Sequence, residues 1–473
     1  MPHESAHNFK TTFRHRRIGA LLRLHGDRPP GTRPRPETIV LDVAPGVAPS
    51  PRPPVRIYVG TEAAQFRAER VLVWSIMRHR DPARRYEIHL MKDLAGIDRH
   101  AWKTGFTCYR YAVPELAGGA GRAIYNDVDQ IYLADPAELF DLDMDGRAQL
   151  GITERENSVM LLDCEPMARI WRVAERRRGE KHKRFRAAVH AAGLWGPLPG
   201  VWNARDGEYV AGQSKLLHFT TLQTQPWVPF PRELRYRDHP LVEVWRELER
   251  DADAAGFTRF TKTRPSQRFA ELLALNRDTH RLGGGGRALS AADTYRGKSL
   301  REHIAPIAAL AAQHRAATIL DYGSGKAQLY DADPDAPAEA RRKTMPAWSG
   351  VKVTCFDPGY EPFSGPIEDA YDGVICTDVL EHLADDDVPW ILDDLFGHAR
   401  RFVYAVAACF PARKTLPNGA NAHVTLQPPE WWREQLEAAS RRRPGVAWML
   451  CAQQSRHGRL LRGDRVFRGG GAR

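Results

Sequence analysis

Residues Gly121–Leu139 read GRAIYNDVDQIYLADPAEL and decide how the first half of the chain is interpreted. Asp127 and Asp129 interrupt an otherwise apolar run, which its pattern predicts to be a β-strand. Because side chains alternate along a strand, both carboxylates are expected to point to the same side. Adjacent carboxylates repel unless a cation joins them, and Mg²⁺ or Mn²⁺ prefers such oxygen ligands. The alternative is a solvated turn that interrupts the strand.

The segments on either side predict a parallel α/β sheet. An apolar strand is expected at Val55–Gly60, a helix at Ala63–Arg78 and another strand at Tyr86–Met91. A further strand is expected at Asn157–Cys164, and an apolar run ends near His218. The order strand, helix, strand is typical of α/β folds.

These segments resemble the family-eight glycosyltransferases, which have a GT-A type nucleotide-binding fold. The resemblance covers roughly residues 55–230 and rests on six blocks in the family's order. The blocks are RIYVGT, AERVLVWSI, FTCYRYAVPEL, GRAIYNDVDQIYLADPAEL, SVMLLDCE and KLLHFTTLQTQPW.

The resemblance implies a site for a divalent ion and a nucleotide-sugar. Asp127 and Asp129 match the family's DxD motif, which holds Mn²⁺ (or Mg²⁺) on the donor's diphosphate, and His218 matches the third protein ligand. Arg110 matches a basic residue that contacts the nucleotide-sugar. The end of the first strand, which cradles the nucleoside, is matched by Tyr58, Val59, Gly60 and Thr61.

The implied reaction transfers a sugar, expected to come from a UDP-sugar with retention of configuration, to a glycan or small-molecule acceptor. Two departures concern the donor sugar and the acceptor geometry. Gln225 stands where the family commonly has a lysine. Ser158 stands where the family has a glycine, and Asn157 lies one residue out of register with the family's asparagine.

A second informative stretch, Thr318–Tyr330, reads TILDYGSGKAQLY. Asp321, Gly323 and Gly325 follow an apolar strand and precede a predicted helix. Glycines let a backbone turn tightly and approach a ligand closely, as in nucleoside-cofactor sites. Ala327 occupies the place of the third glycine of a dinucleotide fingerprint, which disfavours a dinucleotide. A plain strand-to-helix turn is the alternative.

The continuation resembles class I S-adenosylmethionine (SAM) dependent methyltransferases, over roughly residues 293–450. In them, an acid at the position of Asp357 holds the ribose, and Asp378 lies in YDGVICTDVLEHL, which matches the fourth-strand motif. His382 or His423 is a candidate base. Asp378, Glu381, His382 and His423 could instead form a metal site, as in one group of RNA methyltransferases. Alternatively, Glu381 and His382 simply begin a helix beside the methyl donor.

The chain has 473 residues, which favours two domains. The expected fold class is α/β, with an N-terminal GT-A-type domain and a C-terminal Rossmann-like methyltransferase domain. The expected segments are a basic, proline-rich extension (1–54), a glycosyltransferase domain (55–250), a linker (251–290) and a methyltransferase domain (291–473). A short helix at Ile18–Leu24 could contact an anionic membrane, although a basic tail with no specific role is the simpler interpretation.

Composition narrows the functional classes. The net charge is +11, but no nucleic-acid motif accompanies it, so a nucleic-acid partner is disfavoured. The six cysteines form no CxxC pair, and no apolar run is long enough to span a bilayer, which predicts a cytoplasmic protein. The favoured interpretation is a bifunctional glycosyltransferase and methyltransferase. Alternatives are a chain with only one active half, the other being a binding module, and a nucleic-acid-binding methyltransferase.

Overall fold

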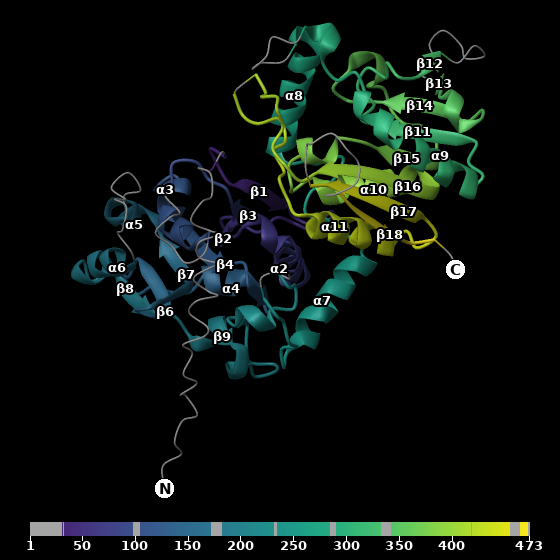
Figure 1. Ribbon diagram of the computed structural model, residues 1–473. Coiled ribbons are helices and arrows are strands. Elements are labelled where there is room, and N and C mark those ends of the chain that lie inside the picture. Colours follow the sequence, from purple (N-terminus) through teal and green to yellow (C-terminus); the bar gives the residue numbers. More distant parts are fainter. Residues whose placement is uncertain are drawn as a thin grey trace. The chain divides into compact units, whose positions relative to one another are not determined.

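The computed structural model describes residue 31 and residues 33–97, 105–171, 182–230, 234–283, 290–332, 342–417, 419–454 and 464–471. The chain divides into two compact units, Met1–Phe257 and Thr258–Arg473, each a mixture of helices and β-sheet (Figure 1). The segment 18–24, considered above as a membrane-contacting helix, lies outside the described residues.

The first unit is built on a seven-stranded sheet with the order β1-β3-β2-β4-β7-β6-β8. β2 is parallel to β3 and β4, whereas β7 is antiparallel to β4. The central strands are almost entirely buried because their residues are apolar on both faces. The strands are β1 (Glu37–Leu41), β2 (Val55–Gly60), β3 (Tyr86–Met91), β4 (Arg122–Asp127), β6 (Gln149–Thr153), β7 (Glu156–Asp163) and β8 (Trp195–Pro197).

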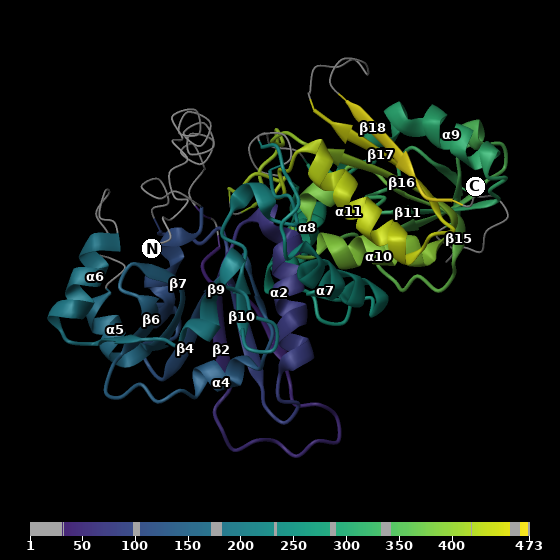
Figure 2. The same cartoon turned by 90° about the horizontal axis from the view of Figure 1, so that it is seen from below.

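A small second sheet lies beside helix α2 (Phe66–His79), which contacts its strand β5 (Gln130–Tyr132) (Figure 2). This sheet has the order β5-β10-β9, with β9 at Ala204–Arg205 and β10 at Leu216–His218. The other helices of the unit are α3 (Val113–Leu116), α4 (Pro136–Phe140), α5 (Cys164–Ile170), α6 (His182–Ala191) and α7 (Val242–Ala254).

The DxD segment is two strands rather than one, which corrects the expectation from sequence. β4 ends at Asp127 in the large sheet, Val128 and Asp129 form a turn, and β5 belongs to the small sheet. The turn is needed because the chain leaves one sheet for the other. Asp127 and Asp129 are therefore joined by a turn, and the alternation of a single strand does not apply to them.

Part of the proline-rich extension joins the fold. β1 pairs with β3 in antiparallel register, and Ile39 and Leu41 are buried. The segment ETIVL alternates apolar and polar residues and forms an edge strand. The prolines around it had favoured an extension outside the fold.

The second unit contains an eight-stranded sheet, β12-β13-β14-β11-β15-β16-β17-β18. Its five central strands, in the order β14, β11, β15, β16 and β17, are parallel, and β13 and β18 are antiparallel to their neighbours. The strands are β11 (Thr318–Tyr322), β12 (Asp331–Ala332), β13 (Arg342–Thr344), β14 (Lys352–Phe356), β15 (Tyr371–Cys376), β16 (Ala399–Ala408), β17 (Ala447–Gln453) and β18 (Arg465–Gly469).

Helices cover both faces of this sheet (Figure 1). α9 (Ile304–Gln313) buries Ile307 and Leu310 in a core with inward-facing strand residues such as Val353 and Phe402. α10 (Val388–His398) and α11 (Pro429–Arg442) pack on β16 and β17 and are absent from that core, so they lie on the other face. A mainly parallel sheet covered on both faces is the doubly wound arrangement.

The segment 251–290, expected as a linker, contains helix α8 (Gln267–Leu282). Ser266 caps it, since its side chain accepts a hydrogen bond from the backbone N–H of Phe269. This helix contributes Leu272 to a small core of the second unit. All six cysteines are unpaired thiols, and five are buried. In the part of the chain that is described, no helix combines the length and apolar character needed to cross a bilayer.

Candidate functional site

The carboxyl ends of β2 and β4 place the DxD carboxylates beside the first strand. Gly60 and Asp127 are direct partners in the parallel register of these strands. β5 and β10 then pair antiparallel, so His218 lies opposite Gln130, next to Asp129 in the chain. As a result, His218 Nε2 lies 3.2 Å from Asp129 Oδ1. The fold thus brings together an aspartate and a histidine that are far apart in the sequence.

Two neighbours orient the imidazole of His218. Its Nδ1 lies 2.9 Å from Asn203 Oδ1 and 3.4 Å from Ser158 Oγ. Burial alone would lower the pKa of His218, but the carboxylates of Asp129 and Asp127 hold it above its ordinary value. Asn203 carries no recognisable motif, so sequence reasoning missed it.

Asp127 is held by a cation and a hydroxyl. Arg110 Nη2 donates to both of its oxygens, at 2.8 and 2.9 Å, and Tyr125 donates through its hydroxyl at 2.5 Å. Burial raises the pKa of Asp127 to about 6 despite the opposing charge of Arg110. Arg110, expected to contact the nucleotide-sugar, therefore binds an acid of the site in this structure, and its guanidinium also lies 5.1 Å from the Tyr125 ring.

The end of β2 is buried. Tyr58 stacks on His89 with ring centroids 4.3 Å apart, and Val59 is fully buried. The Thr61 hydroxyl donates to Glu69 at 2.6 Å. Hence the side chains of the segment expected to cradle a nucleoside are used inside the fold.

The residue types of this first site suit a divalent ion, but the distances between their ligand atoms are too long for one ion in this structure. Two carboxylates and an imidazole are ligands for Mn²⁺, and the buried Asp129 Oδ1 faces the imidazole of His218 at 3.2 Å. However, ligand atoms of Asp127, Asp129 and His218 do not all lie within 4.8 Å of one another. Gln225 donates to the other Asp129 oxygen at 3.3 Å.

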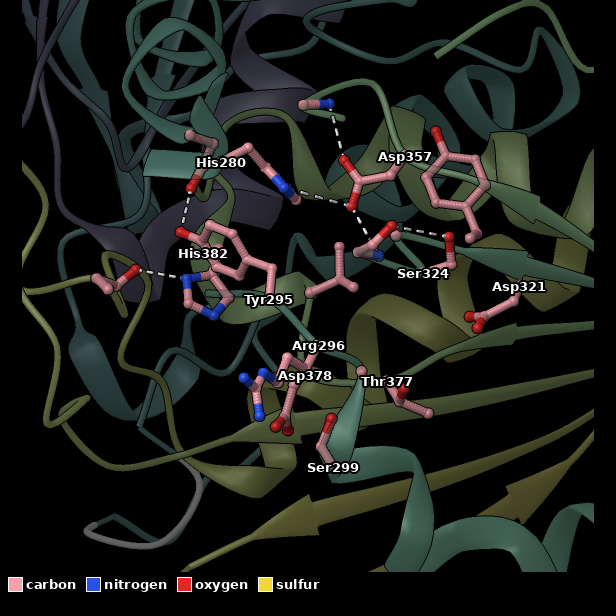
Figure 3. A pocket seen from close by; sticks show the side chains of 18 of the residues that line it. His280, Tyr295, Arg296, Ser299, Asp321, Ser324, Asp357, Thr377, Asp378 and His382 are labelled. Carbon is pink, nitrogen blue, oxygen red and sulfur yellow. Dashed lines mark hydrogen bonds and ion pairs between the residues drawn. The ribbon is translucent and has the colours of Figure 1, made fainter. Parts of the chain in front are cut away.

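The second unit contains a cavity of about 450 Å³ at the carboxyl ends of β11, β14 and β15. β11 is flanked by β14 on one side and by β15 on the other. The chain runs from β11 to the β14 side of the sheet, and the connection from β14 to β15 then crosses back over β11. A doubly wound sheet binds its ligand at the point where the strand order reverses in this way. Figure 3 shows the labelled side chains of Asp321, Asp357, Asp378 and His382 around this space.

The backbone conformation and the close packing of the turn after β11 require glycine at both positions. Gly323 and Gly325 have φ of +84° and +57°. A Cβ on Gly323 would lie 2.3 Å from a methyl of Val379, and one on Gly325 would lie 2.3 Å from the carbonyl oxygen of Tyr295. Because packing alone explains these glycines, they do not by themselves identify a ligand.

Two acids beside this turn, Asp321 in β11 and Asp357 just after β14, differ in the hydrogen bonds that they accept. Asp357 accepts from the backbone N–H groups of Gly325 at 2.9 Å and Gly359 at 2.8 Å. Asp321 accepts from the Tyr330 hydroxyl at 2.8 Å, while its other oxygen is buried without a hydrogen bond. Burial raises the pKa of Asp321 to about 7. An unsatisfied oxygen at the wall of the cavity fits a ligand that brings a donor.

Glu381, His382 and His423 lie close to one another, and the two histidines are at the cavity. They form, within the described part of the chain, the only group of potential metal ligands whose atoms all lie within 4.8 Å of one another. His382 and His423 line the cavity. Burial and the neighbouring His423 lower the pKa of His382 to about 3. Leu380–His382 form one 3₁₀ turn rather than the beginning of a longer helix.

The remaining wall of the cavity comes from residues that no motif marks. His280 stacks on Tyr360 and lies 3.9 Å from Asp357, and the Lys414 ammonium lies 5.4 Å from the Tyr295 ring centroid. His280 comes from α8, the segment expected to be a linker. The packing of α8 on loop residues of the second unit, such as Ala384 and Leu416, is a tertiary feature without a local sequence signal.

Comparisons with known proteins give distant matches. No protein-family model matches the chain, and no curated protein matches its sequence. Solved structures that align with it include WbbM, a bifunctional glycosyltransferase, with 12% identity over 42% of this chain and 53% of that chain, at a TM-score of 0.31. GlyE of Streptococcus pneumoniae, a glycosyltransferase, aligns with 15% identity over 42% of this chain and 60% of that chain, at 0.31.

The galactosyltransferase LgtC, solved with donor and acceptor sugar analogues, aligns with 10% identity over 42% of this chain and 96% of that chain, at a TM-score of 0.29. The chain thus spans 53% of WbbM and 60% of GlyE. At these identities and TM-scores the likenesses establish neither the fold nor the activity of this chain.

Proposed function

We propose that the chain is a two-activity transferase. The first unit transfers a sugar from a nucleotide-sugar, with UDP-sugars as the expected donors. The second unit transfers a methyl group from SAM to a glycan or a related small molecule. The two halves rest on separate observations and are tested separately.

The 3.2 Å approach of His218 to Asp129 supports the first activity, because it joins the last matching block of sequence to the DxD motif. An ion held by Asp127, Asp129 and His218 would supply Lewis-acid neutralisation of the leaving diphosphate. Arg110 adds a buried positive charge beside Asp127, and such a preorganised charge stabilises a negative leaving group.

The test of the first activity is hydrolysis of a panel of UDP-sugars by the full chain with and without Mn²⁺. We expect Mn²⁺-dependent hydrolysis that is lost in the variant Asp127→Asn/Asp129→Asn. Glu165→Gln, an exposed change in the same unit, is the control and keeps the activity. Hydrolysis that needs no metal, or that survives in the double variant, would contradict the proposal.

The cavity at the switch point of the second sheet supports the second activity. When bound, SAM supplies an already activated methyl group, so alignment is the main contribution of the protein. Asp357 follows β14 at the place where an acid holds a ribose, and Asp321 presents an unsatisfied oxygen. His382 and His423 are the candidate bases, although a pKa of about 3 gives His382 little tendency to take up a proton at neutral pH.

The test of the second activity is calorimetric titration of the full chain with SAM. We expect binding that Asp357→Ala weakens by at least about tenfold, since one charged hydrogen bond contributes roughly 1.5–3 kcal/mol. Glu368→Ala, an exposed change outside the cavity, keeps the affinity. Gly323→Val is a poor probe because its side chain would collide with Val379 whether or not SAM binds.

One active half with a binding module as the other remains the second candidate, and Gln225 favours it for the first unit. If SAM binds and no UDP-sugar is hydrolysed, this candidate replaces the bifunctional one. A nucleic-acid-binding methyltransferase rests on net charge alone, and salt-dependent retention on DNA or RNA would be needed to support it.

A further inference from the structure

A lysine lines the cavity of the second unit on the side of His382. The ammonium of Lys414 lies over the Tyr295 ring, 5.4 Å from its centroid. The rings of Tyr295 and His382 are 6.4 Å apart in an edge-to-face arrangement. Figure 3 shows His382 beside Tyr295 and away from Asp321, which lies in β11 next to the glycine turn. The cavity thus presents an acid near the glycine turn and a cation near the histidine.

The loop that carries Lys414 is held in place by its own hydrogen bonds. The Asn421 side chain accepts from the backbone N–H of Ala412 at 2.8 Å and donates to the carbonyl of Ala412 at 2.9 Å. The backbone N–H of Ala422 donates to the carbonyl of Lys414 at 3.1 Å. Leu416 and Ala422 are buried in a small core. The backbone at Lys414 is therefore fixed beside the cavity before any ligand arrives, which lowers the entropic cost of binding.

The ring of Tyr295 supports the ammonium of Lys414. Tyr295 is itself held in place, since its hydroxyl donates to Asn276 at 2.7 Å and its carbonyl accepts from the backbone N–H of Lys326 at 2.8 Å. An aromatic face attracts an ammonium, so it keeps this cation at the wall of the cavity. The Lys414 side chain is only half-buried, and an ammonium has three donors. A ligand anion can therefore bind it in addition to its contacts within the fold.

The charges that line the cavity are not balanced once two groups are set aside. These groups are the acids beside the glycine turn, Asp321 and Asp357, and the ion pair of Arg296 with Asp293. One acid and three cations remain in the lining, namely Asp378, Lys298, Arg413 and Lys414. A hollow lined by an excess of one sign of charge concentrates ligands of the opposite sign.

From the position of these cations we propose that the second unit takes an anionic methyl acceptor, a sugar that carries a phosphate or a carboxylate group. The proposal rests on the proposed function, in which His382 and His423 lie on the side of the methyl acceptor. Lys414 and Arg413 would hold the oxygens of that group by charge-assisted hydrogen bonds. SAM brings a positively charged sulfonium, and an anion beside it offsets the repulsion between the sulfonium and the cations of the protein.

The experiment compares three sugars that differ in charge, in calorimetric titrations of the full chain with and without SAM. The sugars are glucose 6-phosphate, glucuronate and neutral glucose. We expect at least one anionic sugar to bind at least about tenfold more tightly than glucose, as one charge-assisted hydrogen bond would provide. This preference should decrease as the salt concentration rises. The tighter of the two anions shows whether the site is built for a phosphate ester or for a carboxylate.

Substitutions assign the preference to this cavity, because binding of an anionic sugar elsewhere would not respond to them. Lys414→Met should remove most of the preference, and Lys414→Arg should retain it. Lys352→Met is the matched control, since Lys352 is a half-buried lysine at the amino end of β14 and outside the cavity. If Lys414→Met fails to fold, as checked by circular dichroism, Arg413→Gln at an exposed position decides.

Three results would overturn the proposal: equal affinity for all three sugars, no measurable binding of either anion, or a preference that the deciding variant leaves unchanged. Titration with SAM separates this proposal from the proposed function. SAM binding without a preference for the anionic sugars would remove the anionic acceptor and leave the methyltransferase. A preference that depends on Lys414, without SAM binding, would leave the anion site and remove the methyltransferase.

Discussion

Individual buried acids in this protein accept very different numbers of hydrogen bonds, and their pKa values differ accordingly. Asp372 accepts from the backbone N–H groups of Ala317 and Thr318, and these bonds and the charge of Arg401 hold its pKa low despite its burial. Asp321 has one hydroxyl donor, and burial raises its pKa. An acid whose oxygens accept hydrogen bonds within the fold has a structural role. An acid at a cavity with too few donors is a candidate for ligand binding.

The replacement Asp321→Asn should stabilise the ligand-free chain more at pH 8 than at pH 5. Because burial raises the folded pKa of Asp321 to about 7 from its ordinary value of 3.8, Asp321 favours folding at low pH, and this contribution is lost as the pH rises through 7. Asparagine does not titrate, so the stability of the variant relative to the wild type should grow by roughly 2–3 kcal/mol between pH 5 and pH 8. Denaturation curves at the two pH values measure it, and a pH-independent difference would contradict it.

Asn203 is predicted to position His218. Asn203→Ala removes the 2.9 Å contact to Nδ1, and loss of such a contact weakens metal sites by about 10–100-fold. Titration with Mn²⁺ followed by electron paramagnetic resonance measures this affinity. Asn203→Asp keeps an acceptor and should restore most of it. Equal weakening by both changes would indicate a merely structural role.

At the scale of elements, the sequence predicts those strands that depend on a local apolar pattern. It does not predict those elements that depend on tertiary contacts. The strands at Val55–Gly60, Tyr86–Met91 and Tyr371–Cys376 follow from their apolar runs. A turn between β4 and β5 was only the alternative to a single strand, because the sequence does not show that the two parts pair in different sheets. The segment of α8 was expected to be a linker, because the residues on which it packs, such as Ala384 and Leu416, are far away in the sequence.

The residues of the candidate sites divide in the same way. Asp127, Asp129 and His218 could be selected from motifs, and the structure places His218 beside Asp129. Asn203, Tyr125 and His280 could not, because they act through contacts that only the folded chain creates.

The cap at the N-terminus of α8 is predicted to hold this helix in place at the wall of the cavity. Ser266 caps α8 and also donates its hydroxyl to Asp387, which in turn accepts from the indole of Trp390. Ser266→Ala should destabilise the chain by about 1–3 kcal/mol and weaken SAM binding, because α8 lines the cavity. Thermal denaturation and calorimetry measure the two effects. Ser364→Ala, an exposed change, should leave both unaltered.

At the scale of the whole molecule, two compact units with separate sheets imply two separately stabilised structures. A ligand that binds only folded protein raises the stability of the unit that holds it, by about 2.7 kcal/mol at a concentration of 100 Kd. We therefore expect two transitions in calorimetric melting of the full chain, with SAM raising one and UDP plus Mn²⁺ raising the other. Asp127→Asn/Asp129→Asn should abolish only the second shift, and Asp357→Ala should reduce only the first. One transition that both ligands move together would mean that the units unfold as a single cooperative structure, and a ligand that moves neither transition would remove the activity assigned to it.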